Sequence, residues 1–253
     1  MISPEPGSTL NRRPPFLARA ADLLRKLYRD EWGMWNAHYK HYFTIAARAL
    51  GLGFVLGFAF FLLRPDQEKR ALVFVMKSLK DIPLGASPLV LALTLFYHNA
   101  QASALAVVAG IIPFARLPVL DPVANGATLG LLASISKHQG LNVPLLFLKS
   151  VAPHGIIELP AVLYATSVGL YLSVSLGKKL LAWVREKKEG QATGSSAALA
   201  VPVSDAELES LPGPPEAVSE NAAANVVRSF MIVVLPLLLV AAVIEAFITP
   251  VLR

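Results

Sequence analysis

A histidine and a glutamate four positions apart are the residues of this sequence best placed to do chemistry. His154 and Glu158 lie in the stretch PHGIIELPA, between Pro153 and Pro160. On a continuous helix this spacing puts an imidazole and a carboxylate on one face. The pair could handle a proton, an ion or a polar substrate group. It stands at the start of a long apolar run, where ionisable groups are costly and usually face other protein groups.

Polar residues of two other apolar stretches could join this pair. Asn99 lies in FYHNAQAS, and Asn125 precedes Gly126 in VANGATLG. Because polar groups within membrane spans usually face the interior of a helix bundle, Asn99 and Asn125 are predicted to meet His154 and Glu158 there.

Two other interpretations of the His154–Glu158 pair stay open. In the first, Glu158 caps its own helix and His154 bonds a neighbouring carbonyl, so that the pair is only structural. In the second, the pair belongs to a contact surface for a partner protein. Glu245, near the outer end of the last apolar run, is expected to be simply interfacial.

The sequence indicates no catalytic or metal centre. One histidine and one carboxylate make a poor zinc site, and the His-Glu-x-x-His signature is absent. The chain has no cysteine, which excludes disulfides, thiolate ligands and a cysteine nucleophile. We therefore predict no catalytic residue, no metal, no cofactor and no enzymatic activity.

The composition indicates a membrane protein. Of the 253 residues, 55% are apolar and only 16% are charged, whereas soluble domains carry about 25% charged residues. The net charge is +6, and the basic residues flank apolar runs. They are therefore expected to set topology and to contact anionic membrane lipid, and no nucleic-acid partner is predicted.

The apolar runs predict an all-α fold with about five transmembrane helices, since each span needs about 20 apolar residues. The predicted spans are Phe43–Leu63, Pro88–Ile112, Val119–Ile135, Ile156–Leu176 and Phe230–Leu252. Two shorter apolar pieces cannot span: Ala71–Ile82 is predicted to be an interfacial helix, and Leu141–Ala152 a re-entrant segment.

The two prolines of the motif predict a broken helix. The ring of Pro160 would clash with the carbonyl of Ile156 if the helix began much earlier. The fourth span is therefore predicted to begin between Gly155 and Leu159, and Gly155 would let the turn take a conformation with positive φ. The turn would then lie at membrane depth, where irregular backbone must be buried or wet.

The remaining sequence completes the predicted organisation. Arg19, Arg25 and Trp32 belong to a stretch with an apolar face, a basic face and an aromatic belt, which is typical of an interfacial helix. The predicted segments are a disordered tail (1–15), this amphipathic helix (16–42), the bundle of spans one to four (43–185), a flexible cytoplasmic loop (186–225) and the last transmembrane helix (226–253).

The distribution of basic residues predicts the orientation. With the N-terminus inside, 15 Lys and Arg residues fall inside and 8 fall outside. Because cytoplasmic loops carry the excess of basic residues, we predict a multi-pass protein of a prokaryotic cytoplasmic membrane with its N-terminus inside.

Small residues at steps of four predict where helices pack closely. Gly53 and Gly57 form a Gly-x-x-x-Gly pair in the first span, and Ala165 and Gly169 continue a stripe of small residues in the fourth. Such faces allow the close approach of two helix backbones. They serve either packing within the bundle or a homodimer contact.

The order of these motifs resembles the stage II sporulation protein M family. The resemblance is carried by FYHNAQASALAVVAG, ANGATLG and PHGIIELPAVLYATSVGLYL, and it covers roughly Pro88–Gly177. It implies a polytopic membrane protein which, in spore-forming organisms, is a membrane scaffold for peptidoglycan-degrading partners during engulfment. The positions that it marks are Asn99, Asn125, Gly126, His154, Gly155, Glu158 and Pro160.

Two functional hypotheses follow. The first is a non-enzymatic scaffold or assembly subunit for other membrane or envelope proteins, with a possible homodimer. The alternative is a transporter or channel-like component that handles a proton, an ion or a small polar solute through His154 and Glu158.

Overall fold

The chain folds into an all-α bundle. The computed structural model describes residues 15–78, 87–192 and 222–252, and these residues are almost entirely helical and include no strand. The helices are α1 (Pro15–Met34), α2 (Lys40–Leu63), α3 (Pro65–Ser78), α4 (Pro88–Ala109), α5 (Leu120–His138), α6 (Val143–Leu146), α7 (Ala152–Ala192), α9 (Ala222–Ser229), α10 (Leu235–Val243) and α11 (Thr249–Leu252). Single wide π-helical turns, η1 (Trp35–Tyr39), η3 (Phe147–Val151), η4 (Phe230–Val234) and η5 (Ile244–Ile248), connect successive helices, and the 3-10 turn η2 (Leu117–Val119) precedes α5.

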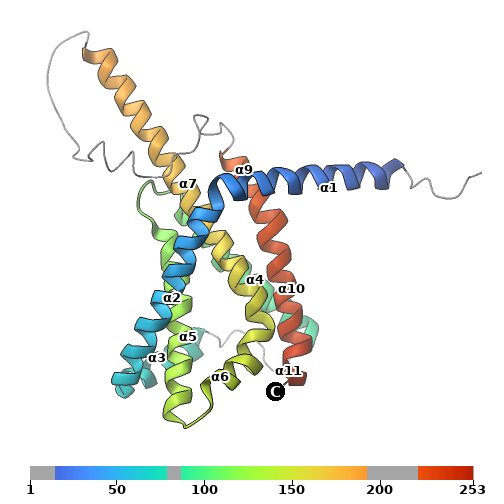
Figure 1. Cartoon of the computed structure of the whole chain (residues 1–253), viewed down its shortest axis with the longest axis vertical. Helices are drawn as coiled ribbons and strands as arrows, with labels where there is room; N and C mark the ends of the chain where they lie inside the picture. The colour runs from blue at the N-terminus through green and yellow to red at the C-terminus, as the bar shows by residue number, and fades with distance from the viewer. Residues whose placement is uncertain (1–14, 79–86, 193–221, 253) are drawn as a thin grey trace, which may run out of the picture.

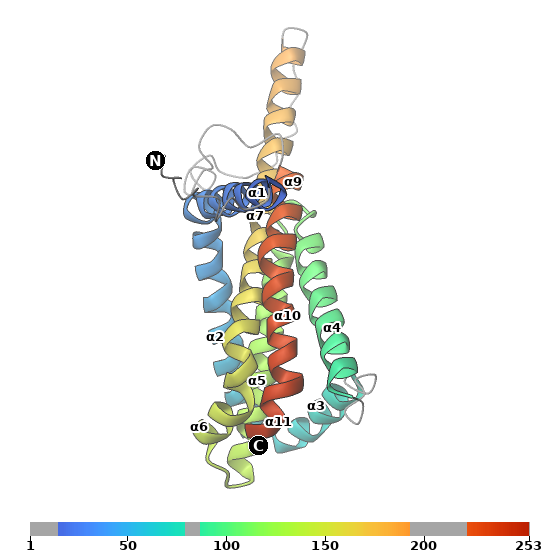
Figure 2. The same ribbon diagram turned by 90° about the vertical axis from the view of Figure 1, so that its right-hand side faces the viewer.

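Five stretches within the described residues are long and apolar enough to cross a membrane, which confirms the predicted fold class. They are Arg19–Leu63, Pro88–Ala109, Leu117–His138, Val143–Arg185 and Ala222–Val251. Successive stretches run in alternating directions through one bundle (Figure 1 and Figure 2). Nearly all of the predicted tail and most of the predicted loop lie outside the described residues.

Helix α7 is the centre of the bundle. In its most apolar window 83% of the residues are buried, against 22–39% in the other four stretches. Every residue from Ala161 to Ser175 is buried, and α2, α4 and α10 all pack against α7. The small residues of this segment let these neighbours approach closely, and the apolar side chains of the outer helices are left to face lipid.

The predicted break before the fourth span is wrong. Helical structure runs without interruption from Val143 through η3 into α7, and Pro160 lies inside α7. Among the described glycines only Gly140 has a positive φ, so Gly155 forms no turn. Helices in membranes tolerate an internal proline because neighbouring groups re-satisfy the freed carbonyl. The bend between α6 and α7 instead lies at the wide turn η3.

Glycines pack α2 directly against α5. A Cβ atom at Gly53 would lie 2.3 Å from the carbonyl oxygen of Val123, and one at Gly126 would lie 2.1 Å from that of Leu50. At Gly57 the nearest atom would be the Cα of Ala127, at 2.8 Å. These distances leave no room for any side chain. The predicted small-residue faces therefore serve helix packing within one chain.

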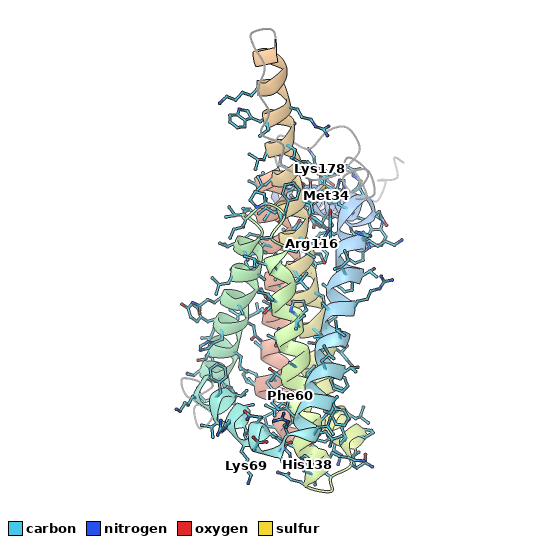
Figure 3. The ribbon with its side chains drawn as sticks, turned by 90° about the vertical axis from the view of Figure 1, so that its left-hand side faces the viewer. Met34, Phe60, Lys69, Arg116, His138 and Lys178 are labelled. Atoms are coloured by element: carbon cyan, nitrogen blue, oxygen red, sulfur yellow. The ribbon has the colours of Figure 1, made fainter. Side chains whose placement is uncertain are left out.

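The two ends of the bundle carry the segments predicted for opposite sides of the membrane. Met34, Arg116 and Lys178 lie at one end, whereas Lys69 and His138 lie at the other (Figure 3). Helix α1 lies across the first end, crosswise to α2, which is the placement of an interfacial helix (Figure 1 and Figure 2). That the first end faces the cytoplasm stays a prediction.

Helix α7 continues beyond the bundle as an arm (Figure 1 and Figure 2). The predicted loop covers residues 186–225, but α7 runs on to Ala192 and α9 begins at Ala222, so both ends of that range are helical. The Leu, Ala, Lys, Arg and Glu residues of this stretch are strong helix formers, which accounts for the difference. At 41 residues, α7 is roughly 60 Å long, about twice the thickness of a hydrocarbon core.

Candidate functional site

His154 and Glu158 share one face of α7. Because the helix is continuous at this point, their spacing of four residues places the two side chains one turn apart. Both residues are half-buried.

The partner of His154 comes from the last span. The Nδ1 atom of His154 lies 2.5 Å from Oε2 of Glu245, and about a fifth of each side chain is exposed. Glu245 belongs to the π-helical turn η5, so the contact joins α7 to the end of the fifth span. The expectation that Glu245 is simply interfacial is therefore wrong. The sequence contains a signal for this contact, because Glu245 is the one ionisable residue between Phe230 and Leu252.

Asn99 brings a third helix to the pair. Its side chain, on α4, forms a hydrogen bond with the carboxylate of Glu158. Glu158 is also close enough to Glu245 for the two carboxylates to repel each other. We refer to His154, Glu158, Glu245 and Asn99 as the motif cluster. It connects α4, α7 and η5 through polar side chains within the span region.

The electrostatic balance of the motif cluster depends on the imidazole. Two carboxylates meet one histidine, so, with both carboxylates ionised, a protonated His154 leaves one net negative charge and a neutral His154 leaves two. Charges held away from water are tolerated when they are paired and hydrogen-bonded, and the amide of Asn99 contributes such a bond to Glu158. Among residues 15–78, 87–192 and 222–252, no group of three His, Cys, Asp or Glu side chains is arranged to hold a metal ion.

Asn125 and Gly126 do not belong to the motif cluster, so that part of the prediction is wrong. The amide of Asn125 donates to the backbone carbonyl of Asp121 at 3.1 Å and to its carboxylate oxygen Oδ1 at 3.3 Å, both on the same helix. Gly126 lies against α2 at Leu50. Gly126 is therefore used to pack α2, and the amide of Asn125 is bonded within α5, whereas the motif cluster is formed by α4, α7 and η5.

Comparison with known protein families gives one match. The family model of stage II sporulation protein M matches residues 46–250, which is most of the chain. The chain belongs to the stage II sporulation protein M family. The match extends from α2 to α11 and includes all four residues of the motif cluster. No curated protein and no solved structure matches the chain.

A second polar cluster of this family member ties α1 to the bundle. Glu31 is only 4% exposed. It accepts a hydrogen bond from the Tyr164 hydroxyl at 2.5 Å, and its other oxygen lies 3.3 Å from Nε of Arg228. Next to it, the Tyr39 and Ser229 hydroxyls are 3.0 Å apart. Sequence reasoning missed this cluster, because its members come from three separate predicted segments: the amphipathic helix, the fourth span and the start of the last transmembrane segment.

A third polar cluster of the family member lies at the other end of the bundle. Glu68 of α3 accepts a hydrogen bond from the Ser134 hydroxyl at 2.6 Å, and the same oxygen lies 2.9 Å from Nδ1 of His138. The serine bonds the carboxylate and not the imidazole, so this is not the arrangement in which a histidine activates a serine nucleophile. The contacts fix α3 to the end of α5.

Proposed function

We propose that this member of the stage II sporulation protein M family is a non-enzymatic membrane scaffold, which holds other membrane or envelope proteins. The observation that carries the proposal is an apolar groove of about 370 Å³ beside the motif cluster. Gly155 and Ala152 belong to its lining, and both are small. The other lining residues are apolar: Pro144, Phe147, Leu148, Val151, Ile156 and Leu159.

Gly155 has no packing role inside the chain. A Cβ atom there would meet only Cγ1 of Val151, at the ordinary contact distance of 3.4 Å. A glycine within a helix is about 1 kcal/mol less favourable than alanine. Close approach of a second helix, whose side chains enter the groove, would offset that cost. Ile156, on the groove, is 72% exposed and offers apolar surface to such a partner.

In this proposal the motif cluster has a structural role, because it holds three helical elements together. His154 and Glu158 use their polar atoms on Glu245 and Asn99 of the same chain. These contacts hold α4, α7 and η5 together at the segment of α7 that also lines the groove. A rigid groove loses less conformational entropy when a partner binds.

A photo-crosslinking experiment in cells tests the scaffold. A benzophenone amino acid at Ile156 is expected to give a discrete protein adduct, identified by mass spectrometry, and Gly155→Leu is expected to remove it by filling the groove. The same probe at Leu52, which is 57% exposed on α2, should give no such adduct. Adducts with lipid alone at both positions would refute the proposal, and an adduct of two copies of this chain would assign the groove to a homodimer.

The motif cluster also favours a second candidate, a component that moves a proton, an ion or a small polar solute. An imidazole 2.5 Å from one carboxylate, with a second carboxylate nearby, is a set of groups that could exchange a proton within a membrane. The purified protein in liposomes that contain a pH-sensitive dye tests this candidate. Proton flux above that of empty liposomes, abolished by Glu245→Gln and kept by Glu68→Gln, would support it. Flux equal to that of empty liposomes would exclude proton transfer.

A further inference from the structure

A second apolar groove lies beneath α1. Its lining adjoins that of the first groove on α7, where Leu159 belongs to the first and Pro160 to the second. Its volume is about 360 Å³, and it lies between α1 with η1, α2, α7 and the last span. The lining is dominated by aromatic and aliphatic side chains: Tyr28, Trp32, Trp35, Phe43, Val233 and Leu237. No residue of the motif cluster lines this groove, and neither functional hypothesis uses it.

The carboxylate of Glu31 and the hydroxyls of Tyr164 and Tyr28, which border this groove, already have partners. Glu31 is bonded by Tyr164 and Arg228. The hydroxyl of Tyr28 points to the carbonyl of Ile232 at 3.4 Å. What the groove offers to a ligand is therefore apolar and aromatic surface, which suits a hydrocarbon chain and not a polar solute.

The position of the groove favours a phospholipid over a spanning helix of a partner protein. Trp32 and Tyr28 are 67% and 54% exposed on α1, and tryptophan and tyrosine are enriched where lipid headgroups meet hydrocarbon. A spanning helix of a partner protein would run alongside α2 and α10 and would meet α1, which lies across its path (Figure 2). A phospholipid ends at that level, so its acyl chain can occupy the groove while its headgroup stays beside α1.

Basic side chains of α1 favour an anionic headgroup on this lipid. Arg25 and Arg29 are both exposed. Each precedes an aromatic residue of the groove by three positions, Arg25 before Tyr28 and Arg29 before Trp32, and residues so spaced are neighbours on a helix. Arg25 also lies 3.7 Å from Asp22 in a surface pair, and such pairs are weak enough for a phosphate to compete with. Guanidinium groups bind phosphate through two parallel hydrogen bonds.

We propose that the groove beneath α1 binds one acyl chain of an anionic phospholipid from the adjacent leaflet, whose phosphate is held by Arg25 and Arg29. The bound lipid fills the space between α1 and α10 and adds to the contacts that hold α1 on the bundle. The site is independent of the groove at Gly155, so it stands whether or not the scaffold proposal holds.

Tryptophan fluorescence measures occupancy of this site directly. The chain has three tryptophans, and Trp183 lies on the arm of α7, so Trp183→Phe leaves Trp32 and Trp35 as the reporters. The protein is reconstituted in phosphatidylcholine vesicles with increasing amounts of phospholipid brominated on the acyl chains, which quenches tryptophan on contact. We expect brominated phosphatidylglycerol to reach half-maximal quenching at a several-fold lower mole fraction than brominated phosphatidylcholine.

Two variants and a matched control separate the groove from general lipid contact. Val233→Phe fills the groove and is expected to abolish the preference for phosphatidylglycerol. Arg25→Gln with Arg29→Gln, at exposed positions that the fold does not need, is expected to abolish it too. Val240→Phe, at a 47% exposed position of the same helix, should keep it. Equal quenching by the two lipids in the parent protein, or a preference that survives both variants, would overturn the proposal.

Discussion

At the scale of single residues, His154 has the most consequential position, because it stands between two carboxylates. Its imidazole contacts the carboxylate of Glu245 and interacts electrostatically with that of Glu158. Without it, the two acids would face each other in a poorly hydrated site, where like charges repel strongly. Without Glu245, by contrast, His154 can still pair with Glu158.

His154→Gln is therefore expected to destabilise the protein more than Glu245→Gln. A lost hydrogen bond between membrane helices costs about 0.6 kcal/mol on average, which sets the scale for Glu245→Gln. The loss for His154→Gln should be several-fold larger, since it adds repulsion between carboxylates. Thermal unfolding in detergent at neutral pH measures both. Equal losses, or the reverse order, would contradict the arrangement of the motif cluster.

Glycines in this protein are predicted to differ sharply in their tolerance of a methyl group. Gly126→Ala would place Cβ 2.1 Å from a carbonyl oxygen of α2. It should lower the free energy of unfolding by about 1–3 kcal/mol or more, because overpacking typically costs that much. Gly51→Ala has no atom within 4 Å and should be neutral or slightly stabilising. Gly155→Ala should resemble Gly51→Ala in the purified chain. A stable Gly126→Ala protein would argue against the close contact of α2 and α5.

At the scale of elements, α1 is held to the bundle by a largely buried ion pair and not by its exposed charges. Arg228 and Glu31 lie 3.3 Å apart with 22% and 5% of their side chains exposed, whereas Arg25 and Asp22 lie 3.7 Å apart with 78% and 76% exposed. Removal of one partner from a buried pair costs about 3–5 kcal/mol, and removal from a surface pair about 0–1 kcal/mol.

Arg228→Ala is accordingly expected to release α1 from the bundle, and Arg25→Ala to leave it in place. Both variants remove one arginine, so the overall change in charge is matched. Tryptic cleavage at Arg29, followed over time in detergent without added lipid, reports the release of α1. Cleavage that is accelerated equally in the two proteins would show that the Glu31 pair does not anchor this helix.

At the scale of the whole molecule, the bundle has two ends whose sides of the membrane can be assigned by experiment. Single cysteines can be introduced without background, because the natural chain has none. With the predicted orientation, cysteine at Lys69 or Lys137 should react with an impermeant maleimide in intact cells, and cysteine at Arg116 or Lys187 only after permeabilisation. The reverse pattern would invert the molecule while leaving the fold unchanged.

Much of this architecture was accessible from the sequence, because it depends on local properties. Long apolar runs define spans wherever they occur, since unpaired backbone groups cannot stay in lipid and a helix satisfies them within one segment. The five spans, the crosswise helix that carries Trp32 and the close-packing glycines Gly53 and Gly57 follow from composition and spacing alone. The i, i+4 relation of His154 and Glu158 belongs to the same class.

The pairing of helices was decided only by the tertiary structure. The contact between α2 and α5 depends on backbone contacts at glycines, and many registers of the two helices would allow such contacts. The sequence therefore could not show that Asn125 lies apart from Glu158. Glu245 reaches His154 across 91 positions of sequence, and Glu31 reaches Arg228 across 197. Periodicity is a short-range signal and reports which side of a helix is polar. Only the packed bundle selects the partner that this side meets.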